Sequence, residues 1–242
     1  MSESNNPLER LVRKLAAHGD LSASDRAAIL ALPHTTRSFD VSTYLVREGD
    51  ALGPCAVLVS GFAFRHKLTD DGARSIVSIH VPGEPLDFQH LFLDEADHNV
   101  QTLTRGKAAL IPRAAIHELA QERPAIMRAI VANISVEASV FREWLANVGR
   151  RDARARIAHL LCEFAVRLDA QGLTRLEGYV LPMTQEQIGD ATGLTAVHVN
   201  RMLKDLEADG LVKRNGRLVS FPDWEGLRDI AGFSERYLHL GK

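Results

Sequence analysis

The spacing of hydrophobic residues changes character along this chain, and each change indicates a different kind of structure. Over residues 7–31 the apolar positions follow a helical period. Over residues 35–117, short β-branched and aromatic runs alternate with glycine- and proline-containing turns, which is typical of a β-sandwich or jelly roll. Near residue 115 the helical period returns and continues. The pattern predicts an α+β chain with a β-roll followed by helices.

One stretch of the second helical part has the spacing of a helix that pairs with a copy of itself. Its apolar positions are separated by alternating steps of three and four residues, which is the heptad seam of paired helices. The predicted interface consists of Met127, Ile130, Ile134, Glu137, Phe141, Trp144 and Val148. Glu137 is the polar member and costs stability unless it has a partner. A helix packed on its own domain is the alternative interpretation.

Residues 184–212 read as two short helices with a tight joint. Thr184 and Gln187 have the spacing of a capping box, Gly193 suits a left-handed helix end, and Thr195 can cap the next helix. A joint of about three residues is the length found in helix-turn-helix motifs. A plain helical hairpin with a solvated outer face remains the simpler alternative.

The second of these helices has a buried side and a presented side. Val199, Met202, Leu203 and Leu206 form one apolar stripe. At about 100° per residue, the opposite face carries Val197, Arg201, Lys204 and Ala208.

Two short strand-like runs follow, over residues 211–221, around Asn215-Gly216. This dipeptide suits a type I′ hairpin, and a hairpin after two helices predicts a winged helix-turn-helix, whose second helix enters the DNA major groove. Arg201 can donate to guanine, Val197 can contact a thymine methyl, and Lys204 can reach phosphate, while Asn200 suits adenine or phosphate. The predicted DNA-binding residues are Thr195, Ala196, Val197, His198, Asn200, Arg201, Lys204, Lys213 and Arg214.

The amino-acid composition restricts the possible functions but does not indicate one. The 242 residues are 45% hydrophobic and 25% charged with a net charge of −2, so DNA binding would have to rest on a local basic patch. RRDARAR at 150–156 and the wing residues Lys213, Arg214 and Arg217 are candidates, and either could be a solvated face. We expect a cytoplasmic protein without membrane contact, because no signal core and no apolar run of about 20 residues is evident.

The order β-roll, long helix and winged helix-turn-helix resembles the Crp/Fnr family of bacterial transcription regulators. The matching stretches are REGD at 47–50, LVSGFAF at 58–64, PGE at 82–84, RIAHLLCEF at 156–164 and the segment 181–212. The resemblance implies a homodimer that reads palindromic double-stranded DNA through recognition helices at about 195–208, contacts RNA polymerase, and holds an effector in the roll. It suggests a sensor domain over 1–124, a dimerisation helix over 125–150 and a DNA-binding domain over 151–242.

The residues of the effector pocket depart from the cyclic-nucleotide pattern of the family. Gly83 and Glu84 are kept, but His98-Asn99 stand at the place of the family's Arg-Ser pair, and Phe141-Arg142 replace the Thr-Ser pair of the long helix. Neutral His and Asn lack the donor fork that Arg offers a phosphate. We therefore expect an effector other than cyclic AMP or cyclic GMP.

Other effectors of the family find little support in the sequence. An iron–sulfur cluster needs more thiolates than Cys55 and Cys162 supply. Haem stays open, because several histidines lie in the roll, although a lone strand histidine is more often structural. These histidines are His66, His80, His90 and His98. No metal site and no cofactor is predicted.

Two other function classes remain. The family commonly has Arg-Glu where this chain has Ala196-Val197, so a ligand-binding dimeric interaction module with degenerate DNA binding is the alternative. An enzyme is the least supported class, because no nucleophile–base pair, metal motif or phosphate loop is evident.

Overall fold

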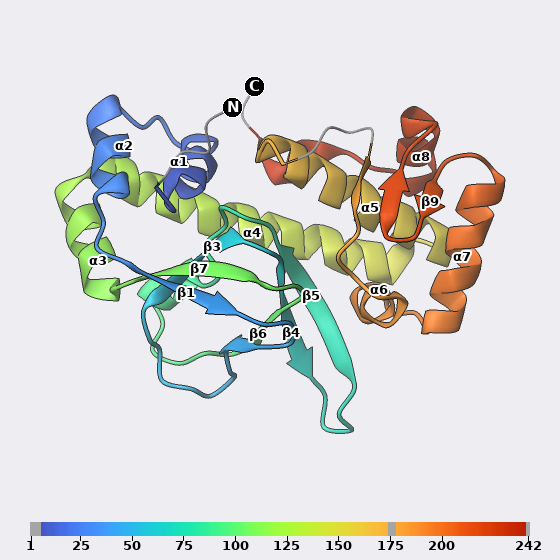
Figure 1. Ribbon diagram of the computed structural model, residues 1–242, viewed down its shortest axis with the longest axis horizontal. Coiled ribbons are helices and arrows are strands. Elements are labelled where there is room, and N and C mark those ends of the chain that lie inside the picture. Colours follow the sequence, from blue (N-terminus) through green and yellow to red (C-terminus); the bar gives the residue numbers. More distant parts are fainter. Residues whose placement is uncertain (1–5, 174–177, 241–242) are drawn as a thin grey trace. The chain divides into compact units, whose positions relative to one another are not determined.

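The computed structural model describes residues 6–173 and 178–240, and they form two compact units (Figure 1). The roll unit comprises Met1–Lys67, Ile79–Ala138 and His239–Lys242. The helix-turn-helix unit comprises Leu68–Ser78 and Ser139–Leu238. The long helix α4 contributes its first part to the roll unit and its second part to the helix-turn-helix unit.

The N-terminal segment forms two helices rather than one continuous helix over 7–31. Helix α1 spans Glu9–Ala16 and α2 spans Ala23–Leu30. The chain leaves the helical path between them because Ser22 starts α2 with a capping box, in which its hydroxyl accepts from the Asp25 amide. The apolar side of α1 is buried.

Two antiparallel sheets form the β-roll, as the turn spacing predicts. One sheet has the order β1-β7-β3, and the other β2-β6-β4-β5. The seven strands are β1 Thr35–Phe39, β2 Tyr44–Val46, β3 Cys55–Ser60, β4 Ala63–Leu68, β5 Arg74–His80, β6 Asn99–Thr102 and β7 Gly106–Ile111.

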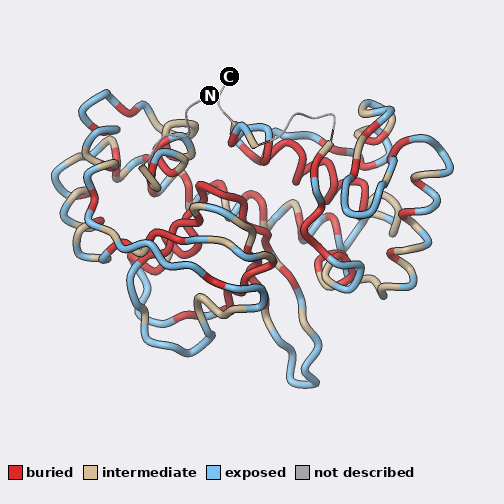
Figure 2. The backbone as a smooth tube through the Cα atoms, in the orientation of Figure 1, coloured by how far each residue is buried: buried red, intermediate tan, exposed pale blue. Residues whose placement is uncertain are grey.

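The core of the roll unit joins the sheet to the helices around it. Buried side chains of α1, α2, β3 and β7 pack with those of α3, which spans Arg113–Glu122, and with the first half of α4. A 3₁₀ helix, η1, spans Phe88–Leu91 and buries Phe88 in the same core. Figure 2 shows this buried backbone at the sheets and along α4, and exposed backbone at the hairpin tips.

Helix α4 spans Pro124–Arg150 and is the longest helix of the described chain. By length and composition it could cross a membrane, since its most apolar 18-residue window has a mean hydropathy of 1.3. This differs from the expectation of no such segment. About 39% of that window is buried within the protein, so the apolar residues are divided between the cores and an outer face.

The helix-turn-helix unit consists of helices and a three-stranded sheet of order β8-β10-β9. Helix α5 carries an almost continuous run of buried residues. The elements are α5 Ala153–Ala170, β8 Gly178–Val180, α6 Gln185–Thr192, α7 Ala196–Ala208, β9 Lys213–Asn215, β10 Leu218–Ser220, α8 Trp224–Ala231 and η2 Glu235–Leu238.

A buried carboxylate ties the C-terminal segment to the helices of this unit. Glu163 on α5 accepts from the Trp144 indole at 2.9 Å, the Tyr237 hydroxyl at 2.8 Å and Arg167 at 3.0 Å. Glu163 is 1% exposed, and these donors stabilise its charge in place of water.

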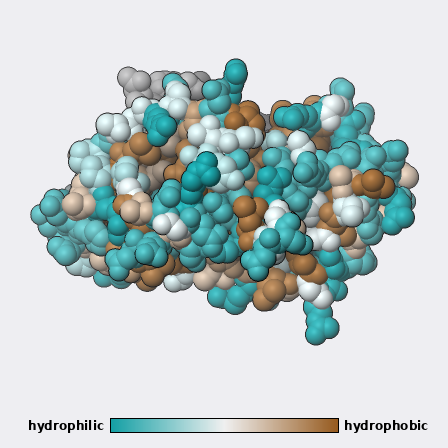
Figure 3. All heavy atoms as spheres, turned by 90° about the horizontal axis from the view of Figure 1, so that it is seen from below, coloured by the Kyte–Doolittle hydropathy of each residue, from teal (hydrophilic) through white to brown (hydrophobic). Residues whose placement is uncertain are grey.

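On the face of the molecule drawn in Figure 3, apolar side chains are scattered among polar ones, as is usual for protein surfaces.

Candidate DNA-binding surface and effector region

The joint between α6 and α7 has the predicted geometry. The Thr184 hydroxyl accepts from the Gln187 amide at 3.2 Å, and the Gln187 side chain accepts from the Thr184 amide at 2.9 Å. Gly193 ends α6 in the left-handed region with φ +68°. The capping box and the left-handed glycine are both confirmed.

A second glycine of this joint was missed by the sequence analysis. A Cβ on Gly189 would lie 2.4 Å from the Leu194 carbonyl oxygen, which is backbone and cannot turn aside. Gly189 therefore lets the turn after α6 close against the helix. A glycine inside a helical pattern was the available signal, because it is unfavourable there unless close packing requires it.

Gly189→Ala is expected to destabilise this unit by a few kcal/mol, because the added methyl forces the turn away from α6. Gly149→Ala is the matched control: its Cβ would meet nothing within 4 Å, and alanine favours helix by about 1 kcal/mol. Thermal unfolding of both variants checks this. An unchanged midpoint for Gly189→Ala would show that the joint does not depend on the close approach.

Helix α7 has the predicted buried and presented sides. Thr195 caps it, and its hydroxyl accepts from the His198 amide at 3.3 Å. Val199 and Leu203 are buried, whereas the Val197 side chain is 82% exposed. An exposed valine at the first turn is unfavourable in water, and it is consistent with a surface that contacts something apolar.

The cations on α7 and the wing differ in whether they form ion pairs with other described residues. Arg201, Lys204 and Lys213 are exposed, and none of them forms an ion pair within residues 6–173 or 178–240. Arg214 instead donates to the Glu207 carboxylate at 2.5 Å, and this contact lowers the pKa of Glu207. Arg214, predicted to contact DNA, is thus engaged within its own unit.

The remaining predicted contact residues lie at the start of α7. Ala196 and His198 are half-buried beside the cap, and Asn200 is half-buried one turn further on. They share the N-terminal turns of the helix with Val197 and Arg201. The structure therefore brings the predicted reading residues together on one helix.

Three arginines of the basic cluster at 150–156 form contacts within the helix-turn-helix unit. Arg151 donates to the Glu143 carboxylate at 2.7 Å, Arg154 pairs with Asp209, and Arg156 donates to the Thr192 carbonyl at 3.1 Å. The Thr192 carbonyl belongs to the C-terminal turn of α6, where a cation is favourable. These three arginines hold helices together and are less available to phosphate.

The wing is present, but its turn differs from the predicted type. Residues 213–215 pair with 218–220, so the two loop residues are Gly216 and Arg217. Only Gly216 has a positive φ, of 60°. A type I′ turn needs positive φ at both loop positions, whereas type II′ needs it at the first. The sequence analysis placed the loop one residue too early.

An exposed apolar stripe runs along α4, and it shares Met127, Ile134, Phe141 and Val148 with the seam that the sequence predicts. Val131, Leu145 and Val148 are 48%, 76% and 38% exposed. They are separated by heptad steps of four and three from further residues that are also not buried. This α4 stripe consists of Met127, Val131, Ile134, Ala138, Phe141, Leu145 and Val148.

Three members of the predicted interface belong to their own units instead. Ile130 is 1% exposed in the core of the roll unit, and Trp144 is 7% exposed with its indole bonded to Glu163. Glu137 pairs with Arg65 at 3.5 Å. The predicted residues are separated by the same steps of three and four as the α4 stripe, which is why the sequence suggested them.

In the roll unit, the residues at the family's nucleotide position are committed to internal contacts. The Glu84 carboxylate accepts from Lys14 at 3.0 Å and from the Val81 amide at 3.2 Å. Gly83 has φ +97° in the same turn. The Asn99 side chain accepts from the Glu48 amide at 3.2 Å. Glu84 thus holds a turn rather than a ligand.

An arginine that the sequence analysis did not consider lies buried in the roll. Arg65 is 3% exposed and donates to the Leu86 carbonyl at 2.6 Å and to Gln89 at 3.4 Å. Together with Glu137, these contacts engage both terminal nitrogens of its guanidinium. The two remaining predicted pocket residues lie in the other unit, where Phe141 is half-buried and Arg142 donates to Ser139 at 2.7 Å.

All four histidines of the roll are buried. Burial lowers the pKa of His80, and it lowers the pKa of His98 to about 4 despite the hydrogen bond to Asp97. His90 lines a pocket of about 160 Å³, together with side chains of β1, β2 and β7. Sites for small organic ligands usually measure about 300–1,000 Å³, so this pocket is small for a nucleotide or a macrocycle.

The two cysteines are free and buried. Burial raises the pKa of the Cys55 thiol, and raises that of Cys162 to about 12. They lie in different units. Both therefore behave as small apolar residues.

Two family models match the chain. A model of the cyclic nucleotide-binding domain matches residues 36–123, and a model of the Crp-like helix-turn-helix domain matches residues 155–230. These segments correspond to the β-roll and to the helices with the wing.

Similar proteins that match over most of their length include named regulatory proteins. The chain is 28% identical over 213 residues to the transcriptional activator protein FnrL of Cereibacter sphaeroides, covering 86% of this chain and 85% of the relative. It is 25% identical over 201 residues to an anaerobic regulatory protein of Haemophilus influenzae, covering 83% and 78%. The solved structure of FixK2 from Bradyrhizobium japonicum has the same fold, with a TM-score of 0.77 and 23% identity over 84% of this chain and 100% of that one.

Proposed function

The chain belongs to the Crp/Fnr family of DNA-binding transcription regulators, and from this premise we propose that it acts as a homodimer on a palindromic site. Each α7 helix would enter the major groove of one half-site, and each wing would follow the phosphate backbone. The observation that carries the proposal is the intact cap and joint of α7, with Val197, Arg201 and Lys204 all exposed.

The α4 stripe supports the dimer. Its seven residues repeat with the heptad spacing, and none of them is buried within the chain. A helix that exposes Leu145 and Val131 to water loses the hydrophobic stabilisation that pairing would provide, at about 25 cal/mol per Å². A second copy of the same helix offers a stripe of matching spacing.

The division of cations supports the mode of DNA binding. Arg201, at the middle of the presented face, would donate to a guanine edge, and Lys204 would meet phosphate. Lys213 and Arg217 on the wing are exposed and extend the same basic region. A protein with a net charge of −2 needs such a local patch to attract DNA.

The alternative is a dimeric ligand-binding module in which DNA binding has degenerated. Ala196 and Val197 motivate it, because they offer no hydrogen bonds to base edges. The structure of the joint favours the DNA-binding function: capping, turn and buried stripe are all intact, whereas a degenerate motif has no need of them. Selection of bound sequences from random duplex DNA tests the proposal. Recovery of no enriched palindrome would support the alternative.

We propose an effector other than a cyclic nucleotide. Glu84, Asn99 and Arg65 are engaged in internal contacts, and the pocket beside His90 is small. Haem would also need more space than this pocket offers, so we do not propose it. The chain has two cysteines against the four thiolates of a common iron–sulfur cluster.

Cyclic AMP is therefore expected to bind poorly or not at all. The measurement is isothermal calorimetry of the purified protein with cyclic AMP, and with inorganic phosphate to detect any general anion site. The physical reason is that the phosphate would meet neutral His98 and Asn99 at the position of the family's arginine. A complex of micromolar affinity would contradict this prediction.

Membership of the family also suggests where the protein acts and what it contacts. The relative from Cereibacter sphaeroides is named a transcriptional activator, and contact with RNA polymerase in the cytoplasm is the expected mode of action for this chain as well. In vitro transcription from a promoter carrying the selected site, with and without the protein, tests whether it activates.

A further inference from the structure

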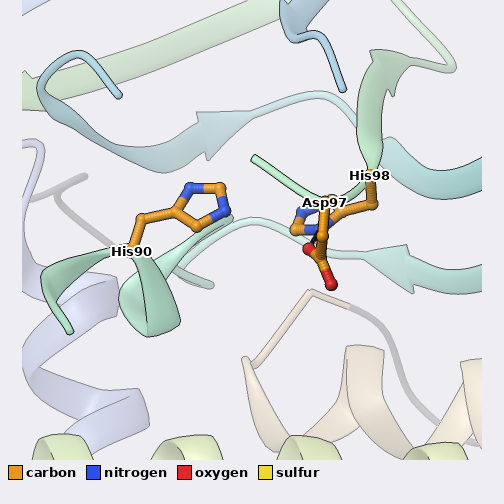
Figure 4. Close-up of side chains that lie close together, drawn as sticks. All are labelled: His90, Asp97 and His98. Carbon is orange, nitrogen blue, oxygen red and sulfur yellow. Dashed lines mark hydrogen bonds and ion pairs between the residues drawn. The ribbon is translucent and has the colours of Figure 1, made fainter. Parts of the chain in front are cut away.

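Three potential metal ligands meet in the roll unit, on the two segments at either end of the loop between η1 and β6. His90 lies on η1, and Asp97 and His98 immediately precede β6. Their ligand atoms all lie within 4.8 Å of one another. In Figure 4 the His90 ring extends toward the Asp97–His98 pair. We call these three residues the His90 cluster.

His90 is the member whose surroundings need an explanation. It is 1% exposed, and neither ring nitrogen has a hydrogen-bond partner among the described residues. The nearest carboxylate, that of Asp87, lies 3.7 Å from Nδ1, which is too far for a hydrogen bond. A buried polar atom without a partner costs about 1–3 kcal/mol. A bound ion is one of the usual reasons for such a group.

The other two members are close enough to share one ion. His98 Nδ1 lies 2.5 Å from the Asp97 carboxylate, so an ion that replaces the Nδ1 proton would meet both of them. The His98 ring is nearly buried, whereas the Asp97 side chain is 77% exposed. The exposed carboxylate is the member of the cluster that an ion from solvent would meet first.

We propose that His90, Asp97 and His98 bind one divalent first-row transition-metal ion of the Zn²⁺, Co²⁺ or Ni²⁺ class. Imidazole nitrogens suit these ions, whereas Mg²⁺ and Ca²⁺ prefer sets of oxygen ligands. With bonds of about 2.1 Å in a tetrahedral site, ligand atoms lie roughly 3.4 Å apart. Small side-chain rotations bring a set within 4.8 Å to that spacing, and water completes the coordination.

The charges around the cluster permit a cation. Arg65 acts on His98 and Lys67 acts on Asp97, and both oppose metal binding. Each of these cations is paired with a carboxylate outside the cluster, Arg65 with Glu137 and Lys67 with Glu48. The carboxylates of Asp87 and Asp97, each close to one ring, therefore leave a site that gains from a divalent cation.

Stacking of the His90 and His98 rings without a metal ion explains fewer of these observations than a metal site does. The rings of His90 and His98 lie 5.2 Å apart at 21°, and the Gln89 amide is 3.5 Å from His98 Nε2. These contacts account for His98. They leave both nitrogens of His90 without a partner among the described residues, and the ion would supply one for one of them.

The test uses the full chain without a histidine tag, freed of metal by chelator. Titration with Co²⁺ is followed by its visible d–d absorption, and calorimetry with Zn²⁺ gives the stoichiometry. We expect one ion per chain, without the intense charge-transfer band of a cobalt–thiolate bond.

The variants locate the ion. His90→Phe keeps an aromatic ring in the core and should abolish binding. Asp97→Asn changes an exposed side chain, so it should fold normally and weaken binding by at least about 10- to 100-fold. His34→Gln, outside the cluster, is the control and should bind as the parent does. Thermal unfolding confirms that each variant is folded.

Three results would overturn the proposal. They are a parent protein that takes up no ion, an unchanged affinity in folded Asp97→Asn and His90→Phe, and a thiolate band that places the ion on Cys55 or Cys162. None of these depends on DNA, so the outcome is separate from that of the proposed regulator function.

Discussion

Leu145→Glu is expected to convert the homodimer into folded monomers. The side chain is 76% exposed in the single chain, so glutamate there is well solvated and the fold should be kept. In a paired helix the same position faces the partner's stripe, where two carboxylates would be buried against apolar groups and each other. The cost of such a buried, unpaired charge is several kcal/mol. Light scattering gives the oligomeric state directly.

The neighbouring residue provides a matched control. Ala146 is exposed and lies about 100° around the helix from Leu145, outside the α4 stripe. Ala146→Glu introduces the same charge at almost the same place and should leave the dimer intact. Monomers from both variants, or from neither, would contradict the stripe as the interface.

Loss of the dimer should also be visible on DNA. Two linked recognition helices gain about 10²–10⁴-fold in affinity over one, because the second binds as part of the same molecule. Leu145→Glu should therefore weaken binding to a palindrome by about 100-fold or more, and Ala146→Glu should not. Binding to a single half-site should be similar for both variants.

The choice between two stripes shows where sequence reasoning stops. Rows beginning at Met127 and continuing through Ile130 or through Val131 both have steps of three and four, and both are mostly apolar. The row with Ile130 and Trp144 looks the stronger on composition alone. Ile130 and Trp144, which distinguish that row, are buried in the chain's own cores, because large residues stabilise a core as well as an interface. Burial decides between them, and burial is a property of the folded chain.

The helix-turn-helix could be predicted because its signals are local. A cap and its partner are three residues apart, and a left-handed glycine acts on its own turn. The close approach of Gly189 to Leu194 depends on how the turn closes, so its necessity was visible only in the structure. The jelly-roll character was predictable for the same reason, since turns punctuate the strands at short range.

Pairs that are distant in sequence could not be predicted. Arg65 meets Glu137, and Glu163 meets Tyr237. Any of the 29 lysines and arginines could in principle pair with any of the 31 acids, and only the fold selects among them. The members of the His90 cluster are close in sequence, but their burial and the approach of their ligand atoms are properties of the fold.

Arg201 and Lys204 are expected to differ in what they recognise on DNA. Arg201 lies on the presented face near the start of α7, and Arg201→Ala should cost about 1–3 kcal/mol per half-site if the guanidinium donates to guanine. The loss should fall on one base pair, so single-base variants of the selected site at that position should bind the mutant alike. Arg105→Ala removes an exposed arginine of the roll unit and serves as the control.

Lys204 is further along the helix, and its flexible ammonium should bind phosphate. Lys204→Ala should weaken the selected site and random duplex equally, and it should lower the salt slope by about one unit for each phosphate that the variant no longer neutralises. With two half-sites engaged, both effects double.

Titrations of the selected site, its single-base variants and random duplex at several salt concentrations separate the two behaviours. If Arg201→Ala changed only the salt slope and kept the base preference, Arg201 would bind phosphate rather than a base. Reading would then rest on Val197, on Asn200 or on the shape of the DNA.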